Sequence, residues 1–269
     1  MVFIRTCPSR LGFPIRRKRT LSSSFAKDKW LRVGPSTPQK IDQEFHGLFA
    51  RTVELTGDAF FVAPPEEITS FVHERAAKRK VPLPSTFMDH PMVDILPLLV
   101  ARCSCQRKLL YDALRSTHGA LNGSFLADLE QNPNVGSTPG PIVPSLNTHS
   151  DVFSYTSQRL AVAKEYFGMQ GVDAYPELAG KRQLSPMMSS IAGLAEMDIK
   201  ALAGNGLHVA VFAAWFLYCI GNVRLRDVRL RRSLPDQELQ KLSRRLCETH
   251  KKMEEAAEEA EEKSDEEED

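Results

Sequence analysis

The stretch "LAGNGLHVAVFAAWFLYCI", residues 202–220, places a Gly-Asn-Gly sequence directly before a long apolar run. The run from Val209 to Ile220 predicts a buried helix, and it is too short to span a membrane, which requires about 20 apolar residues. Glycines before a helix allow positive φ angles and a close approach of the backbone to a neighbour. The N-terminus of the following helix offers unpaired N–H groups that suit a carboxylate or a phosphate. The same pattern is also typical of a plain tight turn before a core helix.

Composition and charge limit the domain organisation and the kinds of site that the chain can have. A chain of 269 residues with 42% hydrophobic content can form one large domain, or one domain with tails. The net charge of +1 is unevenly distributed, because the first 27 residues carry seven basic residues and no acid, and the last sixteen carry eleven acids. Five scattered cysteines lack the paired spacing of zinc sites and favour a reducing, intracellular compartment. We therefore expect no metal site.

Three regions follow from this pattern. We expect residues 1–40 to form a disordered basic arm, residues 41–232 a globular region, and residues 233–269 a C-terminal helix with an acidic tail. The arm could instead be an organelle transit segment, or begin at a misplaced start site. Its "RRKR" cluster, residues 16–19, could be a nuclear address or a phosphate contact. Among these, a nuclear location is favoured over an organelle.

Apolar periodicity predicts a mainly α, α-rich α+β fold with a helical core. Helices are expected over residues 41–57, 64–80, 92–119 with an interruption at Pro97, and 157–171. Residues 121–150 are rich in Asn, Gly, Pro and Ser and predict a long irregular loop, either functional or a plain insertion. Residues 223–232 carry five arginines and read as a strand with one basic face, or as the basic end of a helix.

Two spaced elements carry a resemblance to a known family. The stretch "RLAVAKEYFGMQG", residues 159–171, resembles the ninth conserved block of DNA cytosine-5 methyltransferases, which reads roughly R-x-L-T-x-R-E-x-x-x-L-Q-G. Downstream, "IKALAGNGLHVAV", residues 199–211, resembles the tenth block, which reads roughly Y-K-Q-I-G-N-A-V before a helix. The segment "PSLNTH", residues 144–149, is similar to the Thr-rich segment that commonly precedes the ninth block. The order and spacing of these elements match the family.

The resemblance implies a role for particular residues. In the family the tenth block packs beside the nucleotide-binding sheet, and its Gly-Asn turn contacts S-adenosylmethionine. Carried over, Asn205 and the backbone of Gly206 face the cofactor, and Gly204 permits the close approach. The ninth block implies that Arg159 organises the DNA-facing region, so Arg159 is counted as a nucleic-acid candidate. The positive charge of the arginine-rich segment makes Arg224, Arg226 and Arg229 further nucleic-acid candidates.

The chain departs from the family in ways that matter for chemistry. It has no F-x-G-x-G cofactor loop, no Pro-Cys nucleophile loop and no Glu-Asn-Val, although cytosine methylation requires a thiolate and an acid. We expect the C-terminal target-recognition and cofactor-edge portion of such a protein, incomplete relative to a Rossmann-like methyltransferase. Either the gene model is truncated, another chain or domain supplies the catalytic half, or the sequence has become a binding module. The alternative is a non-enzymatic helical module that binds nucleic acid or protein.

The resemblance also predicts a structural feature. If a sheet normally docks against the tenth block, Asn205 should be exposed beside a large uncovered apolar patch. In a self-contained helical protein, Asn205 would be buried and residues 209–220 would be fully packed.

Overall fold

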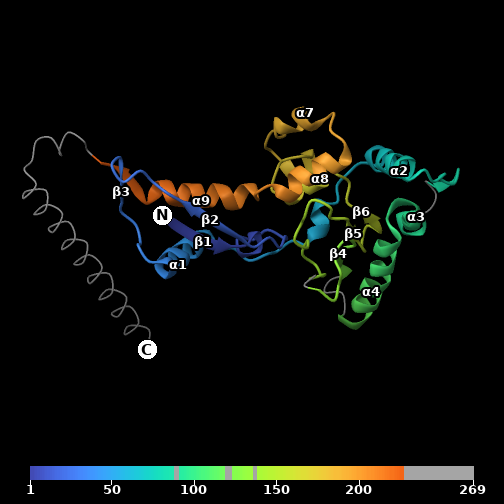
Figure 1. The fold of residues 1–269 in the computed structure, drawn as a ribbon, viewed down its shortest axis with the longest axis horizontal. Coiled ribbons are helices and arrows are strands. Elements are labelled where there is room, and N and C mark those ends of the chain that lie inside the picture. Colours follow the sequence, from blue (N-terminus) through green and yellow to red (C-terminus); the bar gives the residue numbers. More distant parts are fainter. Residues whose placement is uncertain (88–90, 119–122, 136–137, 227–269) are drawn as a thin grey trace, which may run out of the picture. The chain divides into compact units, whose positions relative to one another are not determined.

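The computed structural model describes residues 1–87, 91–118, 123–135 and 138–226 (Figure 1). Helices dominate, and three small antiparallel sheets accompany them, so the fold is broadly α+β as the sequence predicts. The chain forms two compact units. Met1–Ser24 with Pro35–Asn222 make the first, and Phe25–Gly34 with the residues from Val223 onward make the second. Each unit is described by itself.

The first unit begins at the N-terminus itself. Strand β1 (Val2–Thr6) pairs antiparallel with β2 (Arg19–Ser23), and the short 3-10 helix η1 (Pro8–Arg10) lies between them. Side chains alternate between buried and exposed along β1, with Ile4 buried. The prediction of a disordered arm is therefore wrong for residues 1–23. Its basic residues lie between apolar ones that the sheet buries, and charge alone did not reveal that alternation.

Helix α1 (Pro38–Phe49) and helix α9 (Val209–Gly221) pack against this strand pair. The indole N–H of Trp215 on α9 donates to the hydroxyl of Ser23 at 3.0 Å. The ring of Phe45 on α1 lies edge-on to Trp215, with ring centroids 6.0 Å apart. The core of this unit therefore starts with the first strand, and it joins segments from both ends of the unit.

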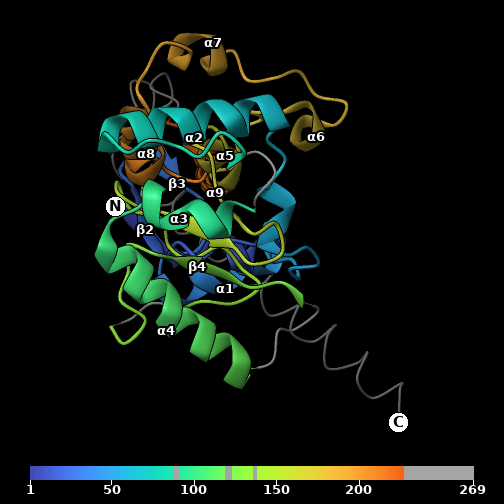
Figure 2. The same cartoon turned by 90° about the vertical axis from the view of Figure 1, so that its right-hand side faces the viewer.

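A second core lies around the sheet β4-β5-β6, built from Leu126–Asp128, Val152–Ser154 and Arg159–Leu160. Helices α2 (Pro65–Arg79), α3 (Met92–Leu99) and α4 (Arg102–His118) share one hydrophobic cluster with this sheet. These three helices face the viewer in Figure 2. Pro97 lies inside α3, and the break between α3 and α4 falls at residues 100–101, a few residues after the predicted interruption.

The predicted loop over residues 121–150 contains β4, so it is less irregular than expected. The buried carboxylate of Asp128 orders it. This carboxylate accepts hydrogen bonds from the Ser150 hydroxyl at 2.6 Å, the Gln131 amide at 2.7 Å and the Asp151 main-chain N–H at 2.9 Å. Because each donor comes from the loop or its end, one carboxylate fixes the backbone of the segment.

Residues 157–171 do not form the single helix that was predicted. Strand β6 takes Arg159–Leu160, and the helix α5 is limited to Glu165–Met169. The short helices α6 (Pro176–Ala179) and α7 (Met187–Ile191) follow α5 and lead to α8 (Glu196–Asn205), whereas the 3-10 helix η2 (Gly57–Phe60) precedes α2. A strand of two residues is too short to produce a periodicity that a sequence pattern can reveal.

The second unit contains a two-stranded antiparallel sheet. Strand β3 (Trp30–Arg32) pairs with β7 (Val223–Leu225), and Leu31 lies opposite Arg224. The strand alternative for the start of the arginine-rich segment is therefore the observed one. Arg229 and the predicted C-terminal helix over residues 233–269 lie outside the described residues.

Within the described residues, one helical stretch is long and apolar enough to cross a membrane by length and composition alone. This stretch, Glu196–Gly221, comprises α8, the residues 206–208 and α9. The finding is weak evidence for a membrane protein, because core helices of soluble proteins pass the same test.

Candidate cofactor edge at the Gly-Asn-Gly sequence

The Gly-Asn-Gly sequence ends a helix and does not form the predicted positive-φ turn. Gly204 and Asn205 are the last two residues of α8, and Gly206 caps it with φ −63° and ψ 161°. The Gly206 N–H donates to the Leu202 carbonyl at 2.8 Å, which completes the last helical turn. Neither glycine has a positive φ. The expectation of a left-handed turn is therefore wrong, because ordinary α-helical hydrogen bonding continues to Gly206.

Gly204 is needed for a close approach, but the neighbour is the chain's own backbone. A Cβ atom added to Gly204 would lie 2.5 Å from the carbonyl carbon and oxygen of Asn147. No side chain fits there without moving the loop. The structure thus corrects the assignment of Gly204 to the cofactor. Its missing side chain allows α8 to dock on the segment that resembles the Thr-rich part of the family.

Arg17 caps the C-terminal end of α8. Its guanidinium donates to the carbonyls of Gly204 and Gly206, the latter at 2.7 Å, and to Leu146 at 2.7 Å. Burial, and then the charge of Arg19, lower the pKa of Arg17 to about 10, so it remains a cation at neutral pH. A cation suits the partial negative charge at a helix C-terminus. Arg17 is therefore a structural residue rather than an exposed part of a nuclear address or phosphate contact.

Gln170, from the stretch that resembles the ninth block, holds the same region from another side. Its side-chain amide donates to the Ala203 carbonyl at 2.9 Å, and its main-chain carbonyl accepts the Val209 N–H at 2.8 Å. The first N–H of α9 is therefore occupied rather than open to a ligand. Two stretches that resemble consecutive blocks of one family pack directly against each other.

His208 is the residue before α9, and it is a packing residue. The centroids of the His208 and Phe13 rings lie 4.6 Å apart. The His208 ring also packs beside Gly171, where an added Cβ atom would lie 3.1 Å from its Cε1 atom. Burial, and then the charge of Arg17, lower the pKa of His208 to about 4. The imidazole is thus neutral at physiological pH. His208 occupies the N-cap position of α9, but its side chain makes no capping hydrogen bond.

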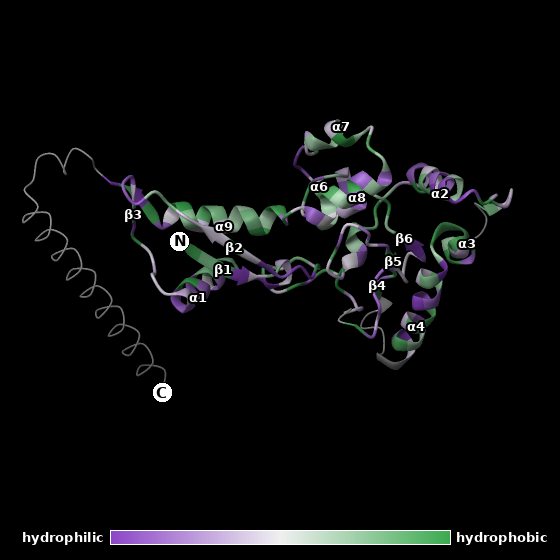
Figure 3. Ribbon diagram, in the orientation of Figure 1, coloured by the Kyte–Doolittle hydropathy of each residue, from purple (hydrophilic) through white to green (hydrophobic). Residues whose placement is uncertain are grey.

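Asn205 differs from its neighbours because it is exposed, and Gly206 is half-buried. Beside them, α9 carries an uncovered apolar face made of Val209, Phe212, Phe216, Leu217 and Ile220, which are between 48% and 62% exposed. The opposite face of α9, with Trp215 and Tyr218, is buried. Figure 3 shows α9 in the hydrophobic colour along most of its length. A helix that is apolar on all sides normally has protein on all sides, so this face lacks a cover among the residues that the structure describes.

Arg159 is unsuited to contact nucleic acid, contrary to its assignment from the sequence. Its guanidinium makes two hydrogen bonds to the buried Glu165 carboxylate, at 2.6 and 2.8 Å. It also lies 5.0 Å from the centroid of the Phe61 ring. The same carboxylate accepts the main-chain N–H groups of Ala63 and Val162, each at 2.9 Å. The pair therefore fixes the geometry of residues 159–165. Both terminal nitrogens of the Arg159 guanidinium already donate to Glu165, so they are not free to bind a phosphate in a bidentate manner.

A buried ionic cluster that the sequence did not reveal holds α8 in place. Arg75 on α2 donates to Asp151 and to Glu196 at 2.6 Å, and Lys200 on α8 donates to Asp151. Burial would lower the pKa of Arg75, but the hydrogen bonds that it donates to the Asp151 and Glu196 carboxylates outweigh burial and raise that pKa. Lys200 is one residue farther from Asn205 than the lysine of the tenth-block pattern is from its asparagine. Its role here is to anchor the helix that ends in Gly-Asn-Gly.

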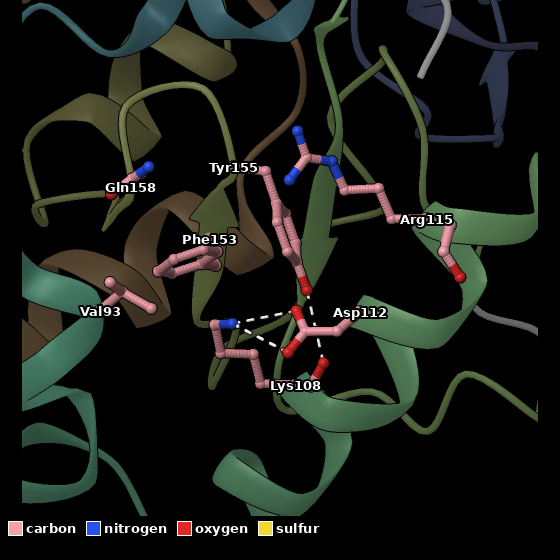
Figure 4. A pocket seen from close by; sticks show the side chains of 8 residues that line it. Val93, Lys108, Asp112, Arg115, Phe153, Tyr155 and Gln158 are labelled. Atoms are coloured by element: carbon pink, nitrogen blue, oxygen red, sulfur yellow. Dashed lines mark hydrogen bonds and ion pairs between the residues drawn. The ribbon is translucent and has the colours of Figure 1, made fainter. Parts of the chain in front are cut away.

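A separate pocket of about 530 Å³ lies where α4 meets β5 (Figure 4). Lys108 bonds Asp112 at 2.9 Å, and its ammonium lies 5.2 Å from the centroid of the Tyr155 ring. The Arg115 guanidinium lies 5.1 Å from the same ring centroid. Burial and then Asp112 raise the pKa of Tyr155, so its hydroxyl stays protonated. The two cations therefore make cation–π contacts with the Tyr155 ring. Among the residues that line this pocket, no serine, threonine or cysteine nucleophile is hydrogen-bonded to a base.

The remaining candidate residues lie in the second unit. Arg224 is exposed on β7, and Arg226 follows β7 and is half-buried. Within the described residues, no group of three His, Cys, Asp or Glu side chains could hold a metal ion. No protein-family model matches this chain, and no curated protein matches it.

Proposed function

We propose that this chain is the C-terminal, target-recognition and cofactor-edge portion of a DNA cytosine-5 methyltransferase-like protein, incomplete for catalysis by itself. In this proposal another chain or domain supplies the Rossmann-like sheet, the F-x-G-x-G cofactor loop and the Pro-Cys nucleophile. The resemblance of residues 159–171 and 199–211 motivates the proposal.

The observation that carries the proposal is the uncovered face of α9 next to the exposed Asn205. One side of α9 packs on β2 and α1, and the other side presents Phe212 and Phe216 with their rings stacked 6.3 Å apart between centroids. Exposed apolar patches of this kind mark places where another protein surface binds. The family resemblance expects a nucleotide-binding sheet against this helix, with the asparagine at its edge.

The packing between the two similar stretches supports the same proposal. Gln170 caps α8 and binds the first N–H of α9, and the Arg159–Glu165 pair orders the strand before it. These contacts are structural, which agrees with the organising role that the resemblance implies for the ninth block. Arg159 thereby keeps a place in the proposal as a positioning residue.

S-adenosylmethionine is the cofactor implied by the resemblance, and the residues fit it in part. Asn205 offers an exposed amide, and Gly206 offers a half-buried backbone without a side chain. Gly204 does not fit, because the Asn147 backbone fills the adjacent space. When bound, the cofactor supplies the methyl group, and this chain would contribute edge contacts alone. Cys7 is no substitute nucleophile, since it is buried and its sulfur accepts the Arg17 main-chain N–H at 3.2 Å.

Calorimetric titration with S-adenosylmethionine tests the proposal. We expect measurable binding by the wild-type chain, and at least tenfold weaker binding by Asn205→Ala. Asn134→Ala changes an exposed asparagine elsewhere in the unit, and serves as the matched control. Equal binding by all three proteins would exclude Asn205 from the site, and no binding by the wild-type chain would remove the cofactor role.

A second function has a specific observation in its favour. The uncovered α9 face and the exposed cations of the second unit also suit a non-enzymatic helical module that binds protein or nucleic acid. This alternative requires neither Asn205 nor a cofactor. A chain that binds no S-adenosylmethionine but still binds a macromolecule through these surfaces would favour it.

A further inference from the structure

The sheet of the second unit brings together two basic segments that are distant in the sequence. Strand β3 and its flanks carry Lys27, Lys29 and Arg32, and β7 with its flank carries Arg224 and Arg226. Asp28 is the single acid in residues 25–34 and 223–226. Pairing of these segments concentrates five cations on a ribbon of two short strands. We refer to residues 25–34 and 223–226 as the basic ribbon.

The register sorts the side chains of the basic ribbon onto two faces. Leu31 lies opposite Arg224, and the Arg226 N–H donates to the Lys29 carbonyl at 2.8 Å, which extends the same register. Because side chains alternate along a strand, Lys29, Arg224 and Arg226 fall on one face. Trp30 and Leu225 lie opposite each other on the other face. The ribbon therefore has one face with three cations and Leu31, the cationic face, and one face on which Arg32 lies among the apolar side chains.

The cations of this face are not neutralised within the described part of the chain. None of Lys29, Arg224 and Arg226 forms an ion pair with a carboxylate of the described residues. Lys29 and Arg224 are exposed. By contrast, most buried cations of the first unit, such as Arg75 and Arg159, are bound by carboxylates. Among the residues that the structure describes, the exposed Lys29 and Arg224 of this face are thus open to an external polyanion, and the half-buried Arg226 adds a third positive charge.

We propose that the cationic face of the basic ribbon binds double-stranded DNA, with the ribbon in the major groove and the arginines at phosphates or base edges. The major groove of B-form DNA admits a two-stranded ribbon, whereas the deep, narrow major groove of duplex RNA excludes it. Arginine forks bind phosphate oxygens in a bidentate manner. The inference adds a DNA contact to the proposed function, which motivates the choice of DNA, but it needs no cofactor and no methyl transfer.

The test measures binding of a random-sequence 20-base-pair DNA duplex to the full chain by fluorescence anisotropy over a salt series, without S-adenosylmethionine. The double variant Arg224→Gln/Arg226→Gln removes two cations from the ribbon. The double variant Lys78→Gln/Arg79→Gln removes two exposed cations from the end of α2 and is the matched control. The double variant Arg224→Lys/Arg226→Lys keeps both positive charges and replaces the planar guanidinium groups with ammonium groups. Circular dichroism of every variant establishes that it is folded.

We expect the ribbon glutamine variant to bind about tenfold more weakly than the control, with a salt slope smaller by about 2, since each phosphate contact contributes about 0.9 to that slope. The lysine variant should keep most of the slope. Equal binding by the ribbon glutamine variant and the control would overturn the proposal, as would equal binding of a duplex RNA of the same length. Loss of cofactor binding with retained DNA binding would reject the proposed function and leave this inference intact.

Discussion

Arg17 donates a hydrogen bond to the main-chain oxygen of Gly204, although 187 residues separate them in the sequence. This contact joins the turn after η1 to the end of α8, and so to the residues that carry the proposed cofactor edge. The guanidinium is almost fully buried, with 1% of its residue surface exposed. The geometry of the Gly-Asn-Gly sequence therefore depends on a residue in the N-terminal segment.

Replacing Arg17 should destabilise the first unit. Arg17→Ala removes hydrogen bonds to the carbonyls of the buried Leu146 and Gly204 and of the half-buried Gly206, and it removes the favourable charge at the end of α8. We expect a loss of about 2–4 kcal/mol in the free energy of unfolding, measured by urea denaturation. The neighbouring Lys18 is exposed, so Lys18→Ala should change it by less than about 0.5 kcal/mol. Similar small effects of both substitutions would show that Arg17 does not hold α8.

Two helical glycines should respond in opposite ways to the same substitution. Alanine is favoured over glycine within helices by about 1 kcal/mol, and Gly47 in α1 has open space for a Cβ atom. Gly47→Ala should therefore stabilise the protein. At Gly204 the added atom meets the Asn147 backbone at 2.5 Å, so Gly204→Ala should destabilise it by about 1–3 kcal/mol. Thermal unfolding of both variants decides this, and stabilisation by Gly204→Ala would contradict the close contact.

Acid should destabilise the first unit through His208. Its pKa falls from about 6.5 in the unfolded chain to about 4 in the folded protein, so the unfolded state binds more protons between these values. Stability is then fully present above about pH 6.5 and declines as the pH falls towards 4. His208→Phe should reduce this decline when unfolding is followed from pH 7 to pH 4. The exposed His149→Gln is the control, and an unchanged pH dependence in the His208 variant would refute the assignment.

Adjacent aromatic residues on α9 should differ in their effects. Trp215 is buried against Ser23 and Phe45, and Trp215→Ala should cost about 3–5 kcal/mol of unfolding free energy. Phe216 is 55% exposed on the uncovered face, so Phe216→Ser should cost less than about 1 kcal/mol. We also expect Phe216→Ser to reduce self-association in light scattering, because it interrupts the exposed apolar patch. A large stability loss at Phe216 would mean that this face is covered within the chain.

Local patterns were sufficient to predict much of the helical framework. The apolar spacing and the prolines placed α2 and the break between α3 and α4 within a few residues. The first helix was predicted less well, because α1 begins at Pro38 and ends at Phe49, eight residues before the predicted end at Gly57. They failed for β1 and β2, because the charges of the N-terminal segment obscured its alternating apolar residues. They also failed for β6, which has two residues and therefore no measurable period.

The candidate site was less predictable, since its contacts are long-range. The sequence singled out Asn205 and expected an apolar patch beside it, which agrees with the exposed face of α9. It did not reveal Arg17 as a cap, because a buried arginine and an exposed one look alike in sequence. Arg159 was misassigned for the same reason, as its partner Glu165 is recognisable only once β6 and α5 are placed. Pairing of β3 with β7 likewise joins segments that no local rule connects.

The contact between Trp215 and Ser23 can form only late in synthesis, because its two residues lie far apart in the sequence. Ser23 leaves the ribosome 192 residues before Trp215. At about 5–20 residues per second, the interval is on the order of 10–40 s. During this interval β1, β2 and α1 exist without the helix that buries their shared apolar surface. The N-terminal segments are thus the last part of the first unit to be completed, because the apolar surface that α9 buries stays uncovered by it until α9 emerges.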